Sequence, residues 1–125
     1  MPYLLDSDVL IDYTRQRKQA AEYIEALPNP SISQITAMEL IVGARDKREV
    51  AYLDELFTEF VIVPLSASIG GRGYGLLKTY SKSHGLHVFD SLIAATAIEE
   101  GLTLVSKNQR HFQMVAGLDL QVPGY

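Results

Sequence analysis

Residues 3–13 read Tyr-Leu-Leu-Asp-Ser-Asp-Val-Leu-Ile-Asp-Tyr, and this stretch decides the fold prediction. Its first three residues are apolar on both faces of an extended chain, which is typical of a short buried strand, and Asp6 would be the last residue of that strand. The polar step from Asp6 through Ser7 to Asp8 can begin a helix, and apolar residues follow it. The stretch therefore predicts a buried strand that leads directly into a helix.

The rest of the chain alternates between short apolar segments and segments with helical periodicity. We predict helices over 18–27, 34–44, 47–60, 66–84, 91–100 and 109–112, and strands over 31–33, 61–64, 102–106 and 118–122. The strand at 61–64 should be buried. The helix at 66–84 should be kinked or irregular, because each of its four glycines costs up to about 1 kcal/mol relative to alanine. Without a hairpin signal, this pattern predicts an α/β protein whose parallel sheet is covered by helices.

Composition narrows the classes of protein. A chain of 125 residues predicts a single domain over residues 1–125, and no linker or repeat divides it. The absence of cysteine excludes disulfides and thiolate metal sites. No apolar run reaches the roughly 20 residues needed to cross a bilayer, so we expect a cytoplasmic protein without membrane contact.

Acidic side chains fall where a parallel sheet binds its ligands, outside the carboxyl ends of the strands. Asp6 ends the first strand, Glu39 lies within the helix at 34–44, and Asp90 precedes the helix at 91–100. Asp8 and Asn108 can join the same edge. Each has a simpler interpretation, since Asp6, Asp8 and Asp90 suit helix N-caps and Asn108 suits a turn. Glu39 is harder to explain in that way, because a carboxylate among apolar neighbours must be exposed or paired.

Convergence of these acids would require a cation. Two carboxylates about 4 Å apart repel by roughly 4 kcal/mol at an effective dielectric constant of 20. Mg²⁺ or Mn²⁺ is the natural partner, since both prefer oxygen ligands, whereas the three histidines lack the spacing of a zinc site. A metal site of this kind suits hydrolysis of a phosphodiester.

Four segments resemble the motifs of PIN domains, and most closely those of VapC-type toxins. They are residues 5–12, residues 36–44 with a glutamate before a glycine, residues 90–97, and residues 101–112. The resemblance covers nearly the whole chain in the family's order. It implies a three-layer α/β/α sandwich with a short, mostly parallel central sheet, and the activity of a metal-dependent endoribonuclease.

The resemblance also assigns roles to individual residues. Asp6, Glu39 and Asp90 match the family's metal-binding acids, and Ser7 and Ser106 match small hydroxyl residues that position the site. The chain departs from the family after its last central strand, where Asn108 and His111 stand in place of a further acid, and Asp8 is a candidate to compensate. A homodimer and a small cognate antitoxin of the VapB type are implied as partners.

The resulting hypothesis is that Asp6, Glu39 and Asp90 hold one Mg²⁺ or Mn²⁺ ion, with Asp8 or Asn108 helping to hold a second. Single-stranded RNA would be the substrate, because its bases are open to recognition. Candidate contacts to the RNA backbone are Lys107, Arg110, Arg45 and Arg48. The net charge of −4 argues only mildly against this hypothesis, because bound cations would reverse the local field.

Three alternatives stay open at this point. The first is a phosphoacceptor receiver domain. Such a domain has paired acids after its first strand and a lysine after a late strand, and Asp6, Asp8 and Lys107 would take these places. This interpretation requires an acceptor aspartate at the end of a central strand, and the candidate, Asp90, opens a helix instead. The second is a catalytically weak PIN-like module that binds RNA or protein, and the missing fourth acid favours it. The third is a DNA-directed nuclease, because metal chemistry at a phosphodiester does not need the 2′-hydroxyl.

Overall fold

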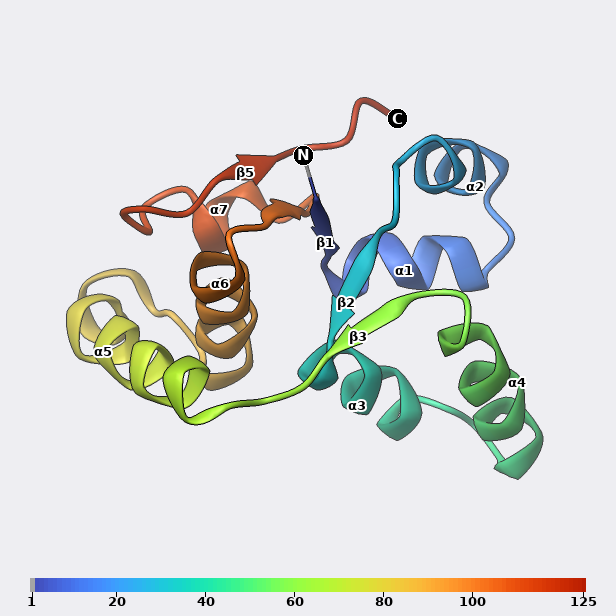
Figure 1. Ribbon diagram of the computed structural model, residues 1–125, viewed down its shortest axis with the longest axis horizontal. Coiled ribbons are helices and arrows are strands. Elements are labelled where there is room, and N and C mark those ends of the chain that lie inside the picture. Colours follow the sequence, from blue (N-terminus) through green and yellow to red (C-terminus); the bar gives the residue numbers. More distant parts are fainter. Residues whose placement is uncertain (1) are drawn as a thin grey trace.

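The computed structural model describes residues 2–125, and within this range five short strands form one sheet in the order β3-β2-β1-β4-β5 (Figure 1). Each neighbouring pair of strands is parallel. The strands are β1 (Tyr3–Leu5), β2 (Ser31–Ser33), β3 (Val61–Val63), β4 (Thr103–Val105) and β5 (Leu120–Gln121). The predicted parallel sheet is confirmed.

Helices connect the strands and cover both faces of the sheet (Figure 1). They are α1 (Ser7–Thr14), α2 (Lys18–Glu25), α3 (Gln34–Val42), α4 (Lys47–Phe57), α5 (Ala67–His84), α6 (Val88–Glu100) and α7 (Gln109–Phe112). In the part of the chain that the structure describes, no helix combines the length and the apolar character needed to cross a membrane.

The two faces of the sheet build two separate cores, because successive residues of a strand point to opposite faces. Leu4 and Leu104 pack in one cluster with side chains of α5 and α6, among them Ile69 and Ile93. The second cluster combines Leu5, Ile32 and Val105 with side chains of α1, α2, α3 and α4. The alternation confirms a three-layer α/β/α arrangement.

The order of the strands creates a switch point between β1 and β4. From β1 the chain adds β2 and then β3 on one side, and it later adds β4 and then β5 on the other. At such a point the connections leave in opposite directions and open a crevice at the carboxyl ends of the strands. Asp6 follows β1 and Ser106 follows β4, so both residues lie at this crevice.

The structure corrects three expectations about single elements. The predicted burial of the strand at 61–64 is wrong, since Val61 and Ile62 are 58% and 40% exposed. The reason is that β3 is an edge strand with a neighbour on one side only. The predicted N-cap role of Asp90 is also wrong. Helix α6 begins at Val88 after the N-cap His87, so Asp90 lies in its first turn.

Helix α5 is continuous over 18 residues, so its glycines do not cause the expected irregularity. Its residues pack along α6, and at Gly73 a Cβ atom would stand 3.0 Å from the Leu92 side chain. Gly73 therefore allows the close approach of the two helices. Tertiary packing along α6 outweighs the low intrinsic helix propensity of the glycines.

Candidate metal-dependent nuclease site

Asp6 is the most deeply buried acid at the switch point, with 2% of its surface exposed. The Ser106 hydroxyl donates to its Oδ2 atom over 2.7 Å, and the Ser7 amide donates to its Oδ1 atom over 2.8 Å. Burial raises the pKa of Asp6 to about 7, the Asp8 and Asp90 charges add to the rise, and the two hydrogen bonds oppose it. At neutral pH this carboxyl is therefore poised between its two charge states, as is common in functional sites.

Asp8 is held by two backbone amides. The Lys107 amide donates to its Oδ2 atom over 2.9 Å, and the Val9 amide donates to its Oδ1 atom over 2.7 Å. Burial raises the pKa of Asp8, although these two amides oppose the rise. Asp8 therefore connects α1 to the segment after β4.

Glu39 reaches the same edge from α3. Its Oε1 atom is buried and lacks a hydrogen-bond partner within the described residues. Burial raises the pKa of Glu39, and the Asp90 charge adds to the rise. A buried carboxylate oxygen without a partner costs free energy, so this atom is suited to a ligand that the protein alone does not supply.

Asp90 lies in the first turn of α6, where the helix N-terminus favours negative charge. Its Oδ2 atom is 3.1 Å from Nδ1 of His111, a residue of α7. Sequence reasoning named His111 only as a substitute for an acid. In the structure His111 contacts one of the acids itself.

The acids lie close enough to affect one another's pKa. The charges of Asp8 and Asp90 raise the pKa of Asp6, and the charge of Asp90 raises the pKa of Glu39. Over residues 2–125, no three acidic or histidine side chains are drawn together tightly enough to count as a metal-ligand cluster.

Asn108 and Lys107 occupy different roles around this crevice. The Asn108 amide donates to Ser106 Oγ over 3.0 Å, and its side chain makes no capping hydrogen bond to α7. The Lys107 ammonium is hydrogen-bonded to Asp12, a residue of α1 that is 6% exposed. The sequence predicts Lys107 as an RNA contact and gives no sign of its engagement inside the protein.

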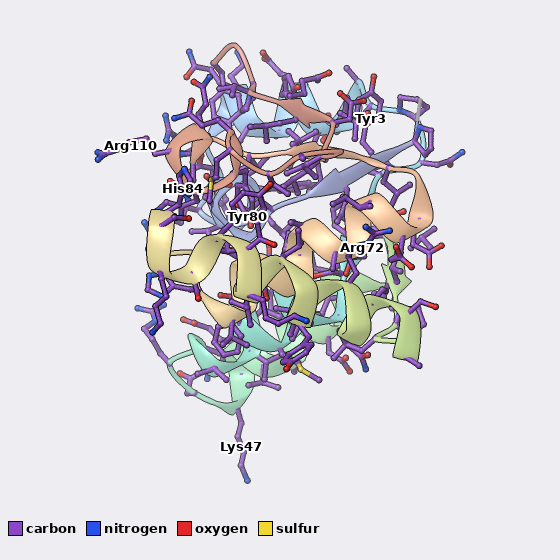
Figure 2. All side chains as sticks on the ribbon, turned by 90° about the vertical axis from the view of Figure 1, so that its left-hand side faces the viewer. Tyr3, Lys47, Arg72, Tyr80, His84 and Arg110 are labelled. Atoms are coloured by element: carbon purple, nitrogen blue, oxygen red, sulfur yellow. The ribbon has the colours of Figure 1, made fainter. Side chains whose placement is uncertain are left out.

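The other predicted RNA contacts divide into two groups. Arg110 projects from α7 near His84, and Lys47, the neighbour of Arg48, projects at the opposite end of the same view (Figure 2). Lys107, Asn108, Arg110 and His111 line one hollow. Arg45 lines a groove that also contains Glu39, and its guanidinium pairs with Glu49. The groove at Arg45 therefore reaches Glu39, and the hollow at Arg110 includes His111, which lies against Asp90.

Sequence reasoning missed Asp12. It stands between Ile11 and Tyr13, one helical turn after Asp8. An acid among apolar residues was the signal that singled out Glu39, and the same signal applies to Asp12. Its partner Lys107 lies 95 positions further along the chain, so no local pattern names it.

The family model for the PIN domain matches residues 3–118. The chain belongs to the PIN domain family. Among curated relatives, ribonuclease VapC19 of Mycobacterium tuberculosis is 34% identical over 125 residues, which cover 96% of this chain and 98% of the relative. Ribonuclease VapC1 of Methanocaldococcus jannaschii is 33% identical over 129 residues, which cover 95% of this chain and 85% of the relative. The PIN domain described here is therefore of the VapC type.

Solved structures agree with this assignment. A toxin–antitoxin complex from Klebsiella pneumoniae contains a chain that is 31% identical, with a TM-score of 0.80 over 93% of this chain and 94% of that one. VapBC2 from Rickettsia felis, solved bound to a promoter DNA fragment, gives a TM-score of 0.84 at 26% identity, with 98% and 99% coverage. The PIN fold predicted from the motifs is confirmed.

The receiver-domain alternative is wrong. A receiver of the flavodoxin-like type orders its strands 2-1-3-4-5, whereas this PIN domain orders them 3-2-1-4-5. Asp90, the required acceptor, lies in the first turn of α6 and does not follow a strand.

Proposed function

We propose that this PIN domain is a metal-dependent endoribonuclease and the toxin of a toxin–antitoxin pair. One observation carries the proposal: Asp6, buried at the switch point with its pKa raised to about 7, lies within electrostatic reach of Asp8 and Asp90. Relatives that are 34% identical over almost their full length are named ribonucleases. A relative from Shigella flexneri, 28% identical, is named a tRNA(fMet)-specific endonuclease.

The donor set fits a hard divalent cation. The acids supply oxygen atoms only, and Glu39 contributes a buried oxygen without a hydrogen-bond partner. We assign Asp6, Glu39 and Asp90 to one Mg²⁺ or Mn²⁺, with Asp8 and Asn108 as candidate ligands of a second. When bound, such ions supply positive charge at the scissile phosphate and lower the pKa of the attacking water.

The chain's own residues prepare the site for that chemistry. Ser106 and the Ser7 amide fix the two oxygens of Asp6, and the Lys107 and Val9 amides fix those of Asp8. Fixed carboxylates need little reorganisation when charge develops at the phosphate, which is the usual source of electrostatic catalysis. His111 holds Asp90 from the side of α7.

RNA would approach along the surfaces that border the acids. We propose Arg110 and the Arg45–Arg48 group as contacts to its backbone, because Arg110 lines a hollow with Asn108 and His111, and Arg45 lines a groove with Glu39. Such contacts fix the position of the strand without reading its sequence. Arg45 would exchange its exposed pairing with Glu49 for a phosphate at small cost, since exposed ion pairs contribute little.

Two protein partners are also part of the proposal, an antitoxin and a second copy of this chain. We propose a small VapB-like antitoxin, since the Klebsiella pneumoniae relative was solved as a toxin–antitoxin complex. We also propose a homodimer, supported by exposed apolar side chains of α3, β3 and the start of α6. They are Met38, Val42, Val61, Ile62, Val88 and Phe89. A cytoplasmic location, where RNA is available, completes the proposal.

The test uses purified protein, free of antitoxin, with matched single-stranded RNA and DNA oligonucleotides in Mn²⁺, Mg²⁺ or EDTA. Asp6→Asn, Glu39→Gln and Asp90→Asn should each abolish RNA cleavage, while Asp54→Asn, at an exposed position of α4, should leave it unchanged. Cleavage by all three site variants would contradict the assignment. Cleavage of DNA alone would favour the DNA-nuclease alternative. Metal-saturated protein that binds RNA without cutting it would favour the binding module.

A further inference from the structure

Asp12 is a buried acid for which the proposed metal chemistry has no use. It accepts hydrogen bonds from the Lys107 ammonium and, over 3.0 Å, from the Tyr125 hydroxyl. The Arg17 guanidinium lies 3.3 Å from its other oxygen. Burial alone would raise the pKa of Asp12, but these partners reverse the effect and lower it. Asp12 is therefore ionised and collects donors from three separate parts of the chain.

Tyr125 belongs to the segment after β5, and this segment is fixed on α1 and α2. Pro123 is buried, and the Tyr125 ring lies 5.8 Å from the Tyr23 ring. The Lys107 ammonium and the Arg17 guanidinium each lie 5.9 Å from the centre of the Tyr125 ring, within the range of cation–π contacts. One tyrosine thus contacts Asp12 and both of its cationic partners.

Lys107 links Asp12 to the acids of the proposed metal site. Its backbone amide donates to Asp8 Oδ2 over 2.9 Å, while its side chain is held by Asp12. Its neighbour Ser106 donates to Asp6 over 2.7 Å. The segment that orients both acids is thereby anchored at a lysine, a residue whose long side chain otherwise has many rotamers.

We propose that Asp12 and Tyr125 are positioning residues, which hold the Lys107 side chain so that Ser106 and Lys107 present their donors to Asp6 and Asp8. This inference rests on the proposed function for its effect on RNA cleavage, but the positioning itself concerns the folded chain alone. A displacement of about 1 Å in such supporting groups can cost about a hundredfold in rate.

A direct RNA contact by Lys107 is the competing explanation, and the two explanations predict different kinetic changes for Asp12→Asn. If the ammonium binds phosphate, removing the Asp12 charge frees it, and KM for RNA should fall. If the ammonium positions the segment, removing the charge loosens the segment, so kcat should fall while KM changes little.

The test compares Asp12→Asn, Lys107→Met, the double variant and Tyr125→Phe, which keeps the ring and loses only the hydroxyl. Tyr74→Phe, at an exposed position of α5, is the matched control. Three readouts are taken: amide hydrogen exchange of Lys107 without metal, the dissociation constant for Mn²⁺ by calorimetry, and kcat and KM on an RNA oligonucleotide. Exchange at Leu104 and Val105 in β4 reports whether each variant stays folded.

We expect exchange at the Lys107 amide to rise about tenfold in Asp12→Asn and Lys107→Met, with β4 protection retained. Mn²⁺ affinity and kcat should each fall about tenfold, with KM within about twofold of the unaltered protein, and the double variant should match the worse single variant. Tyr125→Phe should show a smaller change in the same direction.

Unchanged exchange at the Lys107 amide would overturn the inference, as would a loss confined to KM or additive losses in the double variant. The exchange and Mn²⁺ readouts do not depend on RNA cleavage. If the unaltered protein fails to cleave RNA, the proposed function falls, and these two readouts still decide the positioning role.

Discussion

Ser106 donates a hydrogen bond to the carboxylate of Asp6 over 2.7 Å, although 100 positions separate the two residues in the chain. The bond spans the switch point between β1 and β4, where parallel strands leave a crevice. Both partners are buried, so the hydroxyl replaces water that the ionised carboxylate would otherwise need.

Removing this bond should weaken the site more than the fold. In Ser106→Ala we expect the pKa of Asp6 to rise further, because the hydrogen bond favours the ionised form. At pH 7 the affinity for Mn²⁺ should fall by about ten- to a hundredfold, equivalent to roughly 1.5–3 kcal/mol for a hydrogen bond to a charged group. Calorimetric titration measures this. Ser68→Ala, at an exposed position of α5, is the control, and equal losses in both variants would contradict a role for Ser106.

The raised pKa of Asp6 predicts how stability depends on pH without metal. The pKa rises on folding from its ordinary value of 3.8 to about 7, so the folded protein binds a proton that the unfolded chain has released. The free energy of unfolding should therefore fall as pH rises from about 4 to about 7 and then level off.

Asp6→Asn should remove most of this decline and stabilise the protein at pH 8 by roughly 2–4 kcal/mol. Urea denaturation at several pH values in EDTA measures the effect, and Asp54→Asn should change stability by no more than about 0.5 kcal/mol. A decline of the same size in Asp6→Asn would show that another group is responsible.

Glu39→Gln tests the partnerless oxygen on α3. The amide removes a buried charge, so the metal-free protein should become more stable by about 1 kcal/mol, while Mn²⁺ should no longer raise its melting temperature. Glu55→Gln, at an exposed position of α4, should keep the Mn²⁺-dependent shift. Differential scanning calorimetry with and without Mn²⁺ gives both quantities. A full Mn²⁺-dependent shift in Glu39→Gln would remove Glu39 from the ligand set.

Two glycines of α5 should respond oppositely to substitution. A Cβ atom at Gly71 would meet only open space, so Gly71→Ala should stabilise the helix by about 0.5–1 kcal/mol. Gly73→Leu would force a large side chain against Leu92 and should destabilise the protein by about 1–3 kcal/mol. Thermal denaturation compares them, and stabilisation by both would mean that α5 and α6 pack less tightly than the structure shows.

The sequence predicted the features that depend on local pattern. Buried strands of a parallel sheet are short apolar runs, and the acids after β1 and in α3 stand out against apolar neighbours. The start of α3 is likewise local, because Ser33 directly precedes the helix and accepts a hydrogen bond from the Thr36 amide over 3.0 Å. These features need only residues that are close in the chain.

Features that depend on contacts between residues far apart in the chain could not be predicted from the sequence. The exposure of β3 follows from its place at the sheet edge, and the continuity of α5 follows from packing along α6 at Gly73. The Lys107–Asp12 pair joins residues 95 positions apart. A basic residue beside a nucleic-acid site suggests a phosphate contact, and only the fold reveals an internal partner.

The most direct test of the account is the rate of cleavage of one single-stranded RNA as a function of Mn²⁺ concentration, for the unaltered protein and for Asp6→Asn. The account predicts a rate that is zero in EDTA and saturates with Mn²⁺ in the unaltered protein, and no cleavage at any Mn²⁺ concentration in Asp6→Asn. Cleavage in EDTA, or a saturating rate that survives in Asp6→Asn, would contradict it.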